Sequence, residues 1–242
     1  MALVALVGAC LPALADQRYE VSGNDLYQVG EADLQTTISY TGTQQLVLKK
    51  EGAHTRLEAR VQYTRTDAAG KVPAQASFVQ EMSPAGELKD KSDSDPDYLT
   101  VLNQPFAAMV DGGTLHDLLH LHGDVPFTFP APMIGGQLHG YLRRGAVSRV
   151  DNRPALAVDF DATGPMVGPL PDHSDMSITG KMRMRGTAYY AVRGTALLLA
   201  LRETLTITGK LQQRTQSSPV KIEYQRMLRA QTSAAPETEA YR

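Results

Sequence analysis

Apolar and polar residues alternate along the segment from Met176 to Leu228, and this period of two constrains the fold more than any other feature of the chain. Successive side chains of a strand point to opposite faces, so the pattern is typical of antiparallel strands with one face buried. Breakers at Gly180, 193–195 and 216–219 divide the segment into a β-meander. The apolar positions are Met182, Met184, Ala188, Tyr190, Leu205, Ile207, Leu211, Val220, Ile222 and Tyr224.

The first half of the chain follows the same period. Its clearest strand, 55–66, directs Leu57, Ala59, Val61 and Tyr63 to one face. We expect further strands at 18–22, 36–40, 46–50 and 75–82, and a hairpin of 138–150 with 155–162 that turns at 151–154. The polar segment 24–33 predicts a loop, and the proline-rich segment 164–171 predicts a rigid connector.

Residues 96–123 have the spacing of a helix rather than of a strand. Asp95 or Asp97 is a suitable N-cap, and apolar residues then recur at intervals of three and four. Pro105 must interrupt the run, and 112–113 is a Gly-Gly stop before a second short helix. The pattern predicts one or two short helices that pack on the sheet. The apolar segment 126–136 contains three prolines, which exclude a central strand, and we expect it to cross an opening of the sheet or line a cleft, or else to be a buried connector.

Composition excludes several classes of protein. The chain has 242 residues and a formal net charge of −2, whereas binding to nucleic acid or to an anionic membrane surface calls for a basic excess. No uninterrupted apolar run reaches about 18 residues, so we expect no membrane-spanning helix in the mature protein. A β protein of this length commonly forms one domain, which we place at 16–230, with a helical insertion at 96–123 and a disordered tail at 231–242.

The amino terminus has the features of an export signal. From Ala2 to Leu14 there is no charged residue, and Ala13-Leu14-Ala15 fits an A-x-A cleavage site, so we predict a signal peptide at 1–15 and a periplasmic or secreted protein. Cleavage after Ala15 would remove Cys10, the single cysteine, and exclude disulfides from the mature chain. Val7-Gly8-Ala9-Cys10 also resembles a bacterial lipobox, which leaves a lipid anchor at Cys10 as the alternative.

Motifs for catalysis are weak or missing. Nucleophile-elbow, phosphate-loop and dinucleotide patterns are not found in the sequence, and we predict no enzyme activity and no cofactor. His116, His120 and His122 are weak candidates for metal ligands, because two of them are four residues apart on a predicted helix. The H-E-x-x-H glutamate is missing from this cluster, so histidines at the border of core and solvent are the alternative. The acidic segment 89–96 lacks the glycine and glutamate of a calcium-binding loop and predicts a solvated link.

Taken together, these elements predict a mainly β fold: a curved antiparallel sheet of about 9–11 strands, a half-barrel or open barrel, with one or two short helices on its concave face. The strands from Thr36 to Met82, the helical stretch 96–123 and the meander from Met182 to Leu228 resemble the half-barrel proteins of the bacterial envelope, such as the outer-membrane lipoprotein carrier. The segments GTAYY and GTALLLALRETLTITG also resemble the last strands of uncharacterised secreted bacterial proteins.

The resemblance implies an exported protein that holds a lipid, an acyl chain or another apolar small molecule between the sheet and the helices. The residues that would line this site are Leu102, Phe106, Met109, Leu118, Phe127, Phe129, Met133, Met182, Met184 and Tyr190. The same residues would form a solid core if the inner face is fully packed. A structural or partner-binding envelope protein without a small ligand is the second hypothesis, and a metal-dependent hydrolase built on the histidines is the third.

Overall fold

The fold is described from a computed structural model, in which residues 14–30, 35–82, 92–93, 99, 120, 123–131, 136–170, 173–192 and 197–231 are described. The described residues form one antiparallel sheet of eleven strands, of which β5 has only two residues. The strands are β1 (Leu14–Val29), β2 (Gln35–Glu51), β3 (His54–Asp67), β4 (Gly70–Met82), β5 (Ser92–Asp93), β6 (Asp124–Ala131), β7 (Gly136–Val150), β8 (Arg153–Leu170), β9 (His173–Ala191), β10 (Leu198–Gln213) and β11 (Gln216–Ala230).

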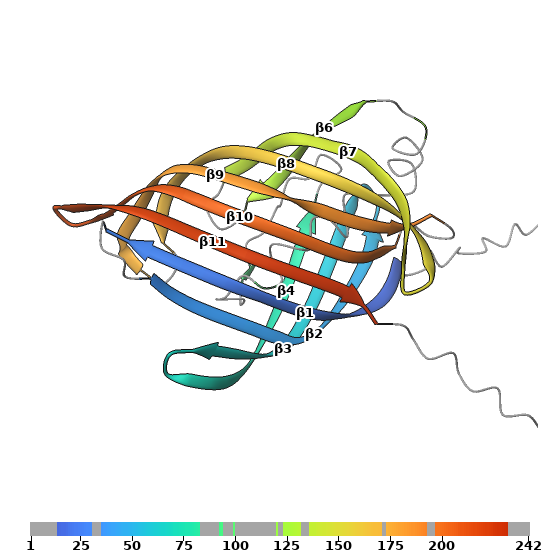
Figure 1. The fold of residues 1–242 in the computed structure, drawn as a ribbon, viewed down its shortest axis with the longest axis horizontal. Coiled ribbons are helices and arrows are strands. Elements are labelled where there is room, and N and C mark those ends of the chain that lie inside the picture. Colours follow the sequence, from blue (N-terminus) through green and yellow to red (C-terminus); the bar gives the residue numbers. More distant parts are fainter. Residues whose placement is uncertain are drawn as a thin grey trace, which may run out of the picture.

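The sheet is open and its strands form two meanders. The strand order is β5-β4-β3-β2-β1-β11-β10-β9-β8-β7-β6, so β1 and β11 join the two halves of the chain at the centre of the sheet. The sheet curls strongly, and in Figure 1 β3 and β4 pass behind β9, β10 and β11 and cross their direction. A mainly β, antiparallel, curved sheet is therefore confirmed.

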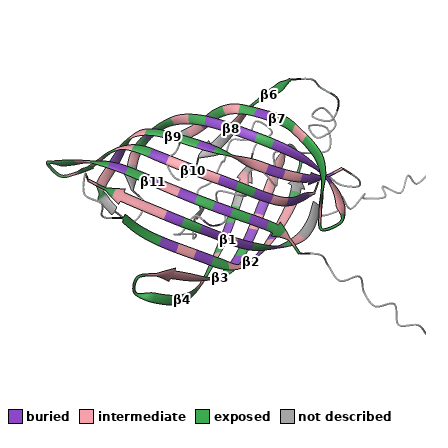
Figure 2. Ribbon diagram, viewed as in Figure 1, coloured by how far each residue is buried: buried purple, intermediate pink, exposed green. Residues whose placement is uncertain are grey.

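One face of the curled sheet forms the core. Burial alternates along the strands, which gives the banding of Figure 2. Val61 and Phe78 from one half of the sheet belong to the same buried cluster as Leu156 and Ile178 from the other half, so the two halves enclose a single core. The inward positions predicted for 55–66 and for the final meander are confirmed, except that Leu211 is only partly buried.

The predicted hairpin of β7 and β8 is also confirmed. Asp151 and Asn152 turn the chain with φ values of 48° and 63°. Asn and Asp tolerate this left-handed conformation, which matches the twist of the flanking strands. The turn from β10 to β11 lies at Arg214 (φ 53°), so the breaker predicted at 216–219 is in fact the start of β11.

Glycines on the inner face allow the sheet to bend. A Cβ atom added to Gly140 of β7 would lie 2.0 Å from the carbonyl oxygen of Asp161, and one added to Gly180 of β9 would lie 2.1 Å from that of Thr208. Real Cβ atoms do not come so close to a backbone oxygen. Neighbouring strands therefore approach each other on the concave side at positions where no side chain fits, as expected for a sheet curved at strand-interior glycines.

Two segments predicted to be irregular are strands. Residues 24–29, predicted as part of a loop, belong to β1 and pair with both β2 and β11. Residues 164–170, predicted as a connector, continue β8. The prolines are tolerated there because β8 pairs only with β9 beyond Thr163, so that Pro165 and Pro169 need no amide hydrogen on the other side.

The proline-rich segment after residue 123 is an edge strand. Residues 124–131 form β6, which pairs only with β7. Pro126 and Pro130 fit this position, since proline is confined to strands with a free side, and they also discourage pairing with a further chain. The prediction that the prolines exclude a central strand is confirmed.

The predicted helices are not confirmed. Of residues 96–123, the structure describes only Leu99, His120 and Gly123, and the remainder of the predicted helical insertion lies outside the described residues. The described part of the chain contains almost no helix, and none that is long and apolar enough to cross a membrane. The predicted signal peptide lies outside the described residues up to position 13, as does the predicted tail from 232 onward.

Candidate functional site

A cluster of charged side chains is buried in the apolar inner face. Among the described residues, the buried polar side chains are Asp25, Gln44, Glu203 and Arg226. Glu203 of β10 and Arg226 of β11 are direct cross-strand partners, and Gly23 of β1 follows Arg226 in the same row. Three neighbouring central strands thus bring together residues that are about 200 positions apart in sequence, as in the 201-residue separation of Asp25 and Arg226.

Arg226 and Asp25 form a fully buried ion pair. A terminal nitrogen of Arg226 donates to Asp25 Oδ1 at 2.5 Å and to the Gln225 carbonyl oxygen at 2.9 Å. The other carboxylate oxygen of Asp25 accepts hydrogen bonds from the hydroxyls of Tyr40 at 2.9 Å and Tyr27 at 3.4 Å. Both carboxylate oxygens of Asp25 are therefore satisfied, which is the condition for a buried charge to be tolerated.

Aromatic rings enclose the guanidinium group of Arg226. The group lies 5.1 Å from the ring centre of Tyr40 and 5.6 Å from that of Tyr224, within the range of cation–π attraction. Gly23 makes room for it, since a Cβ atom at Gly23 would lie 2.9 Å from the Arg226 side chain. Burial raises the pKa of Tyr224 well above its ordinary value, so this ring stays neutral at physiological pH.

The carboxyl group of Glu203 is buried without a hydrogen-bond partner. Its side chain is 4% exposed, and neither carboxylate oxygen has a hydrogen-bond partner in the structure as described. Its other cross-strand neighbour is Gly186, over which the ring of Phe160 lies: a Cβ atom at Gly186 would be 2.6 Å from that ring. Burial raises the pKa of Glu203 well above its ordinary value and so favours the neutral, protonated form, although the charge of Arg226 opposes the shift.

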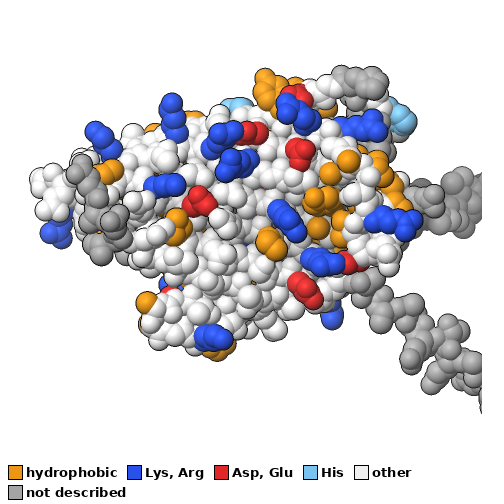
Figure 3. Space-filling model, in the orientation of Figure 1, with side chains coloured by type: hydrophobic (Ala, Val, Ile, Leu, Met, Phe, Trp, Pro, Cys, Tyr) orange, Lys and Arg blue, Asp and Glu red, His pale blue; other side chains and the backbone are white. Residues whose placement is uncertain are grey.

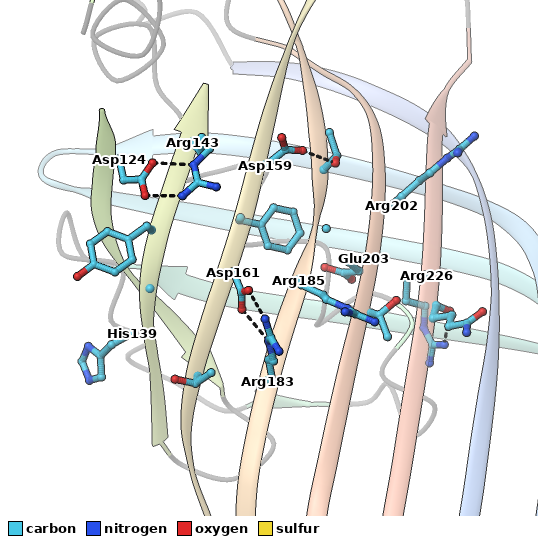
Figure 4. Close-up of a pocket in the computed structure, with 18 of the residues that line it drawn as sticks. Asp124, His139, Arg143, Asp159, Asp161, Arg183, Arg185, Arg202, Glu203 and Arg226 are labelled. Atoms are coloured by element: carbon cyan, nitrogen blue, oxygen red, sulfur yellow. Dashed lines mark hydrogen bonds and ion pairs between the residues drawn. The ribbon is translucent and has the colours of Figure 1, made fainter. Parts of the chain in front are cut away.

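An open groove of about 930 Å³ crosses β6 to β11; outward-facing side chains of these strands line it, together with residues of the inward rows, among them Phe160, Gly186, Glu203 and Arg226. Exposed charged side chains are spread over the outer face in Figure 3. Arg143 pairs with both oxygens of Asp124, and Arg183 pairs with both oxygens of Asp161, as the dashed lines in Figure 4 show. These hydrogen bonds lower the pKa values of Asp124 and Asp161, but solvent screens exposed pairs of this kind and they contribute little to stability.

The structure describes only part of the predicted apolar site. Met182, Met184 and Tyr190 lie fully buried on the inner face, in the cluster against which the partly buried Phe127 packs. Phe129 is in edge strand β6. The other predicted lining residues, Leu102, Phe106, Met109, Leu118 and Met133, lie outside the described residues.

The predicted metal ligands are not brought together in the described part of the chain. His120 is exposed, and His116 and His122 lie outside the described residues. Among the residues that were placed, no group of three or more His, Cys, Asp or Glu side chains has the geometry of a metal site.

Sequence reasoning missed the buried cluster. The signal was present in the alternation, because Glu203 stands between Leu201 and Leu205, and Arg226 stands between Tyr224 and Leu228, at positions that the pattern directs inward. A charged residue in an inward position requires a partner or a function. Asp25 gives no such signal, because the polar composition of 24–33 predicts a loop.

Comparisons with known proteins leave the family open. No family model matches the chain, and no curated protein matches it. Among solved structures, a lipovitellin structure concerned with lipid–protein interactions in that protein is 9% identical, with a TM-score of 0.44, and the match covers 90% of this chain and 25% of lipovitellin. DynF from the dynemicin biosynthesis pathway of Micromonospora chersina is 7% identical, with a TM-score of 0.24, and the match covers 90% and 85% of the two chains. At these TM-scores neither likeness bears on function, and the resemblance to envelope carrier proteins stays a prediction.

Proposed function

We propose that this protein binds an apolar or amphipathic small molecule, a lipid or an acyl chain, against the inner face of its curled sheet and has no enzymatic role. The observation that carries the proposal is the inner face itself: one continuous apolar surface, shared by all the long strands and folded back on itself. Soluble proteins that hold apolar ligands bury them in apolar interiors with few polar groups, and this interior has that composition.

The length of the strands supports the proposal. β9 has 19 residues, which at about 3.3 Å per residue gives a strand of about 60 Å. Strands of globular proteins usually have about 5–6 residues. An inner face of this length can accommodate a fully extended acyl chain along its strands.

Met182 and Met184 are well suited to such a ligand. Both point to the inner face from β9, and flexible thioether side chains adapt to ligands of variable shape. We include Tyr190 and Phe127 in the proposed lining. Leu102, Phe106, Met109, Leu118, Phe129 and Met133 remain candidates from the sequence.

The proposal includes export. It rests on the uncharged apolar segment from Ala2 to Leu14 and on the small residues before Asp16. A periplasmic or secreted lipid-binding protein and a partner-binding protein of the cell envelope both fit these sequence features, and they differ in whether the interior holds a ligand.

Native mass spectrometry of the protein, purified from an exporting bacterial host without detergent, tests the proposal. We expect a bound mass that organic extraction removes and that is identified as lipid. A bare polypeptide mass, together with failure of the extracted protein to take up a fatty acid, would overturn the proposal in favour of a solid core.

Photo-crosslinking locates the bound molecule. A fatty acid with a diazirine in its chain should label peptides that contain Met182 and Met184. The outer-face residue Met227 of β11, which is exposed, is an internal control of the same residue type. Labelling of Met227 in preference to the β9 methionines would place the lipid on the outer face and contradict the proposed site.

A further inference from the structure

Glu203 occupies a position where a carboxyl group is costly. A buried polar group without a hydrogen-bond partner destabilises the folded protein, because it has lost its hydration without compensation. Among the described residues, Glu203 is the buried acid without any hydrogen-bond partner, whereas the neighbouring Asp25 has three side-chain donors. A methionine or leucine would fill this apolar position without that cost, so the carboxyl group needs an explanation other than packing.

Arg226 does not supply the missing partner. It stands directly across from Glu203 on β11, but its guanidinium group turns toward β1, where it pairs with Asp25 and lies against Gly23. The ion pair of Arg226 and Asp25 is neutral as a unit. Glu203 is therefore left beside a completed pair, with Phe160 and Gly186 on its other side.

We propose that Glu203 recognises the hydroxyl group of a neutral amphipathic ligand whose apolar chain lies along the inner face. This inference rests on the proposed function, because it assigns the polar end of the same ligand. A protonated carboxyl group donates one hydrogen bond and accepts others, and a hydroxyl group matches it in both roles.

Charge decides between a hydroxyl and an ionised head group. An ammonium group would favour the ionised form of Glu203, but it would also place a second cation beside the guanidinium group of Arg226. A carboxylate would lose its hydration in the apolar core, where the charge of Arg226 is already matched by Asp25. The raised pKa of Glu203 agrees with a neutral site, since a protonated acid needs no counter-charge. A neutral hydroxyl head group, as in a monoacylglycerol, avoids both the repulsion and the cost of burying a charge.

Binding of two probes of equal chain length to the delipidated full chain tests the inference. 1-Monooleoylglycerol carries hydroxyl groups and methyl oleate does not. We expect the natural protein to bind 1-monooleoylglycerol at least tenfold more tightly than methyl oleate. Glu203→Met should abolish this preference while retaining the affinity for methyl oleate, and Glu203→Gln should retain most of the preference because an amide also donates and accepts.

The outcomes separate this inference from the proposed function. Equal binding of the two probes by the natural protein would overturn the role of Glu203 and leave the apolar site intact, whereas binding of neither probe would overturn both. Tighter binding of oleylamine than of 1-monooleoylglycerol would replace the hydroxyl by a cation and contradict the inference. Thermal unfolding checks that the variant is folded. The melting temperature of Glu203→Met should be at least that of the natural protein, because the substitution removes an unsatisfied buried group.

Discussion

Among single residues, the ion pair of Arg226 and Asp25 should matter most for stability. Asp25→Asn leaves the guanidinium group of Arg226 in the core without its counter-charge. Removing one partner of a buried pair costs about 3–5 kcal/mol, and we expect a loss of this size in the free energy of unfolding, measured by urea denaturation.

An exposed pair is the matched control for this prediction. Asp161→Asn removes the partner of Arg183 on the outer face, and we expect a much smaller loss than for Asp25→Asn, because solvent screens this exposed pair. The double variant Asp25→Leu with Arg226→Met should recover most of the stability, because an apolar pair replaces the charges. Equal costs for Asp25→Asn and Asp161→Asn would show that the buried pair has no special role.

The pKa of Glu203 predicts a dependence of stability on pH. The folded protein holds the Glu203 proton more tightly than the unfolded chain does, because burial raises the pKa in the folded state. This contribution is complete below the ordinary pKa of 4.5 and is lost as the pH rises toward the folded-state value. Urea titrations from pH 5 to 8 should show the free energy of unfolding of the natural protein falling, relative to Glu203→Gln, by up to about 1.4 kcal/mol per pH unit. Parallel curves for the two proteins would contradict the raised pKa.

Within the strands, curvature depends on glycines that have no space for a side chain. Gly140→Ala places a methyl group 2.0 Å from the Asp161 carbonyl oxygen, and relief requires β7 and β8 to move apart. We expect a cost at the upper end of the range for overpacking, about 3 kcal/mol, in the free energy of unfolding. Gly145→Ala in the same strand is the control, since its closest contact is the side chain of Ala157 at 3.0 Å, and its cost should be clearly smaller. Equal effects would show that the inner-face glycines are not needed for the bend.

A glycine and a charged residue at inward positions explain why the second half of β1 could not be predicted from the sequence. Where apolar residues hold the inward positions, as in 55–66 and the final meander, the alternation gave both the strands and their buried faces. In the second half of β1 the inward positions are Gly23, Asp25 and Tyr27, so that a glycine and a charge interrupt the apolar pattern and the segment resembles a loop. The pairing with Arg226, which is distant in sequence, and the hydrogen bonds from Tyr27 and Tyr40 make Asp25 compatible with a buried strand.

The buried cluster was hidden for a related reason. Glu203 and Arg226 were visible as charges at inward positions, but their relation to Asp25 depends on β1 and β11 being neighbours at the centre of the sheet. That pairing joins the two ends of the sheet-forming chain, and no local pattern specifies it. Prolines were misleading in β8 for the same reason, because Pro165 is permitted only where the pairing of β8 with β7 has ended, which is a property of the whole sheet.

For the whole molecule, the curled sheet links ligand binding to stability. The inner faces of both halves contribute to one core, so a molecule held against that core interacts with the folded state and not with the unfolded chain. A ligand at a hundred times its Kd should then stabilise the protein by about 2.7 kcal/mol. We expect the melting temperature of delipidated protein to rise with the concentration of 1-monooleoylglycerol below its aggregation limit. Glycerol alone should have no effect at the same concentrations.

Binding and unfolding involve the same core, so Met184→Ala should affect both. We expect it to lower the unfolding free energy of the free protein by about 2–5 kcal/mol and to reduce the stabilisation by the lipid. A shift that persists unchanged in Met184→Ala would place the lipid away from β9, and a melting temperature independent of lipid would contradict an interior site.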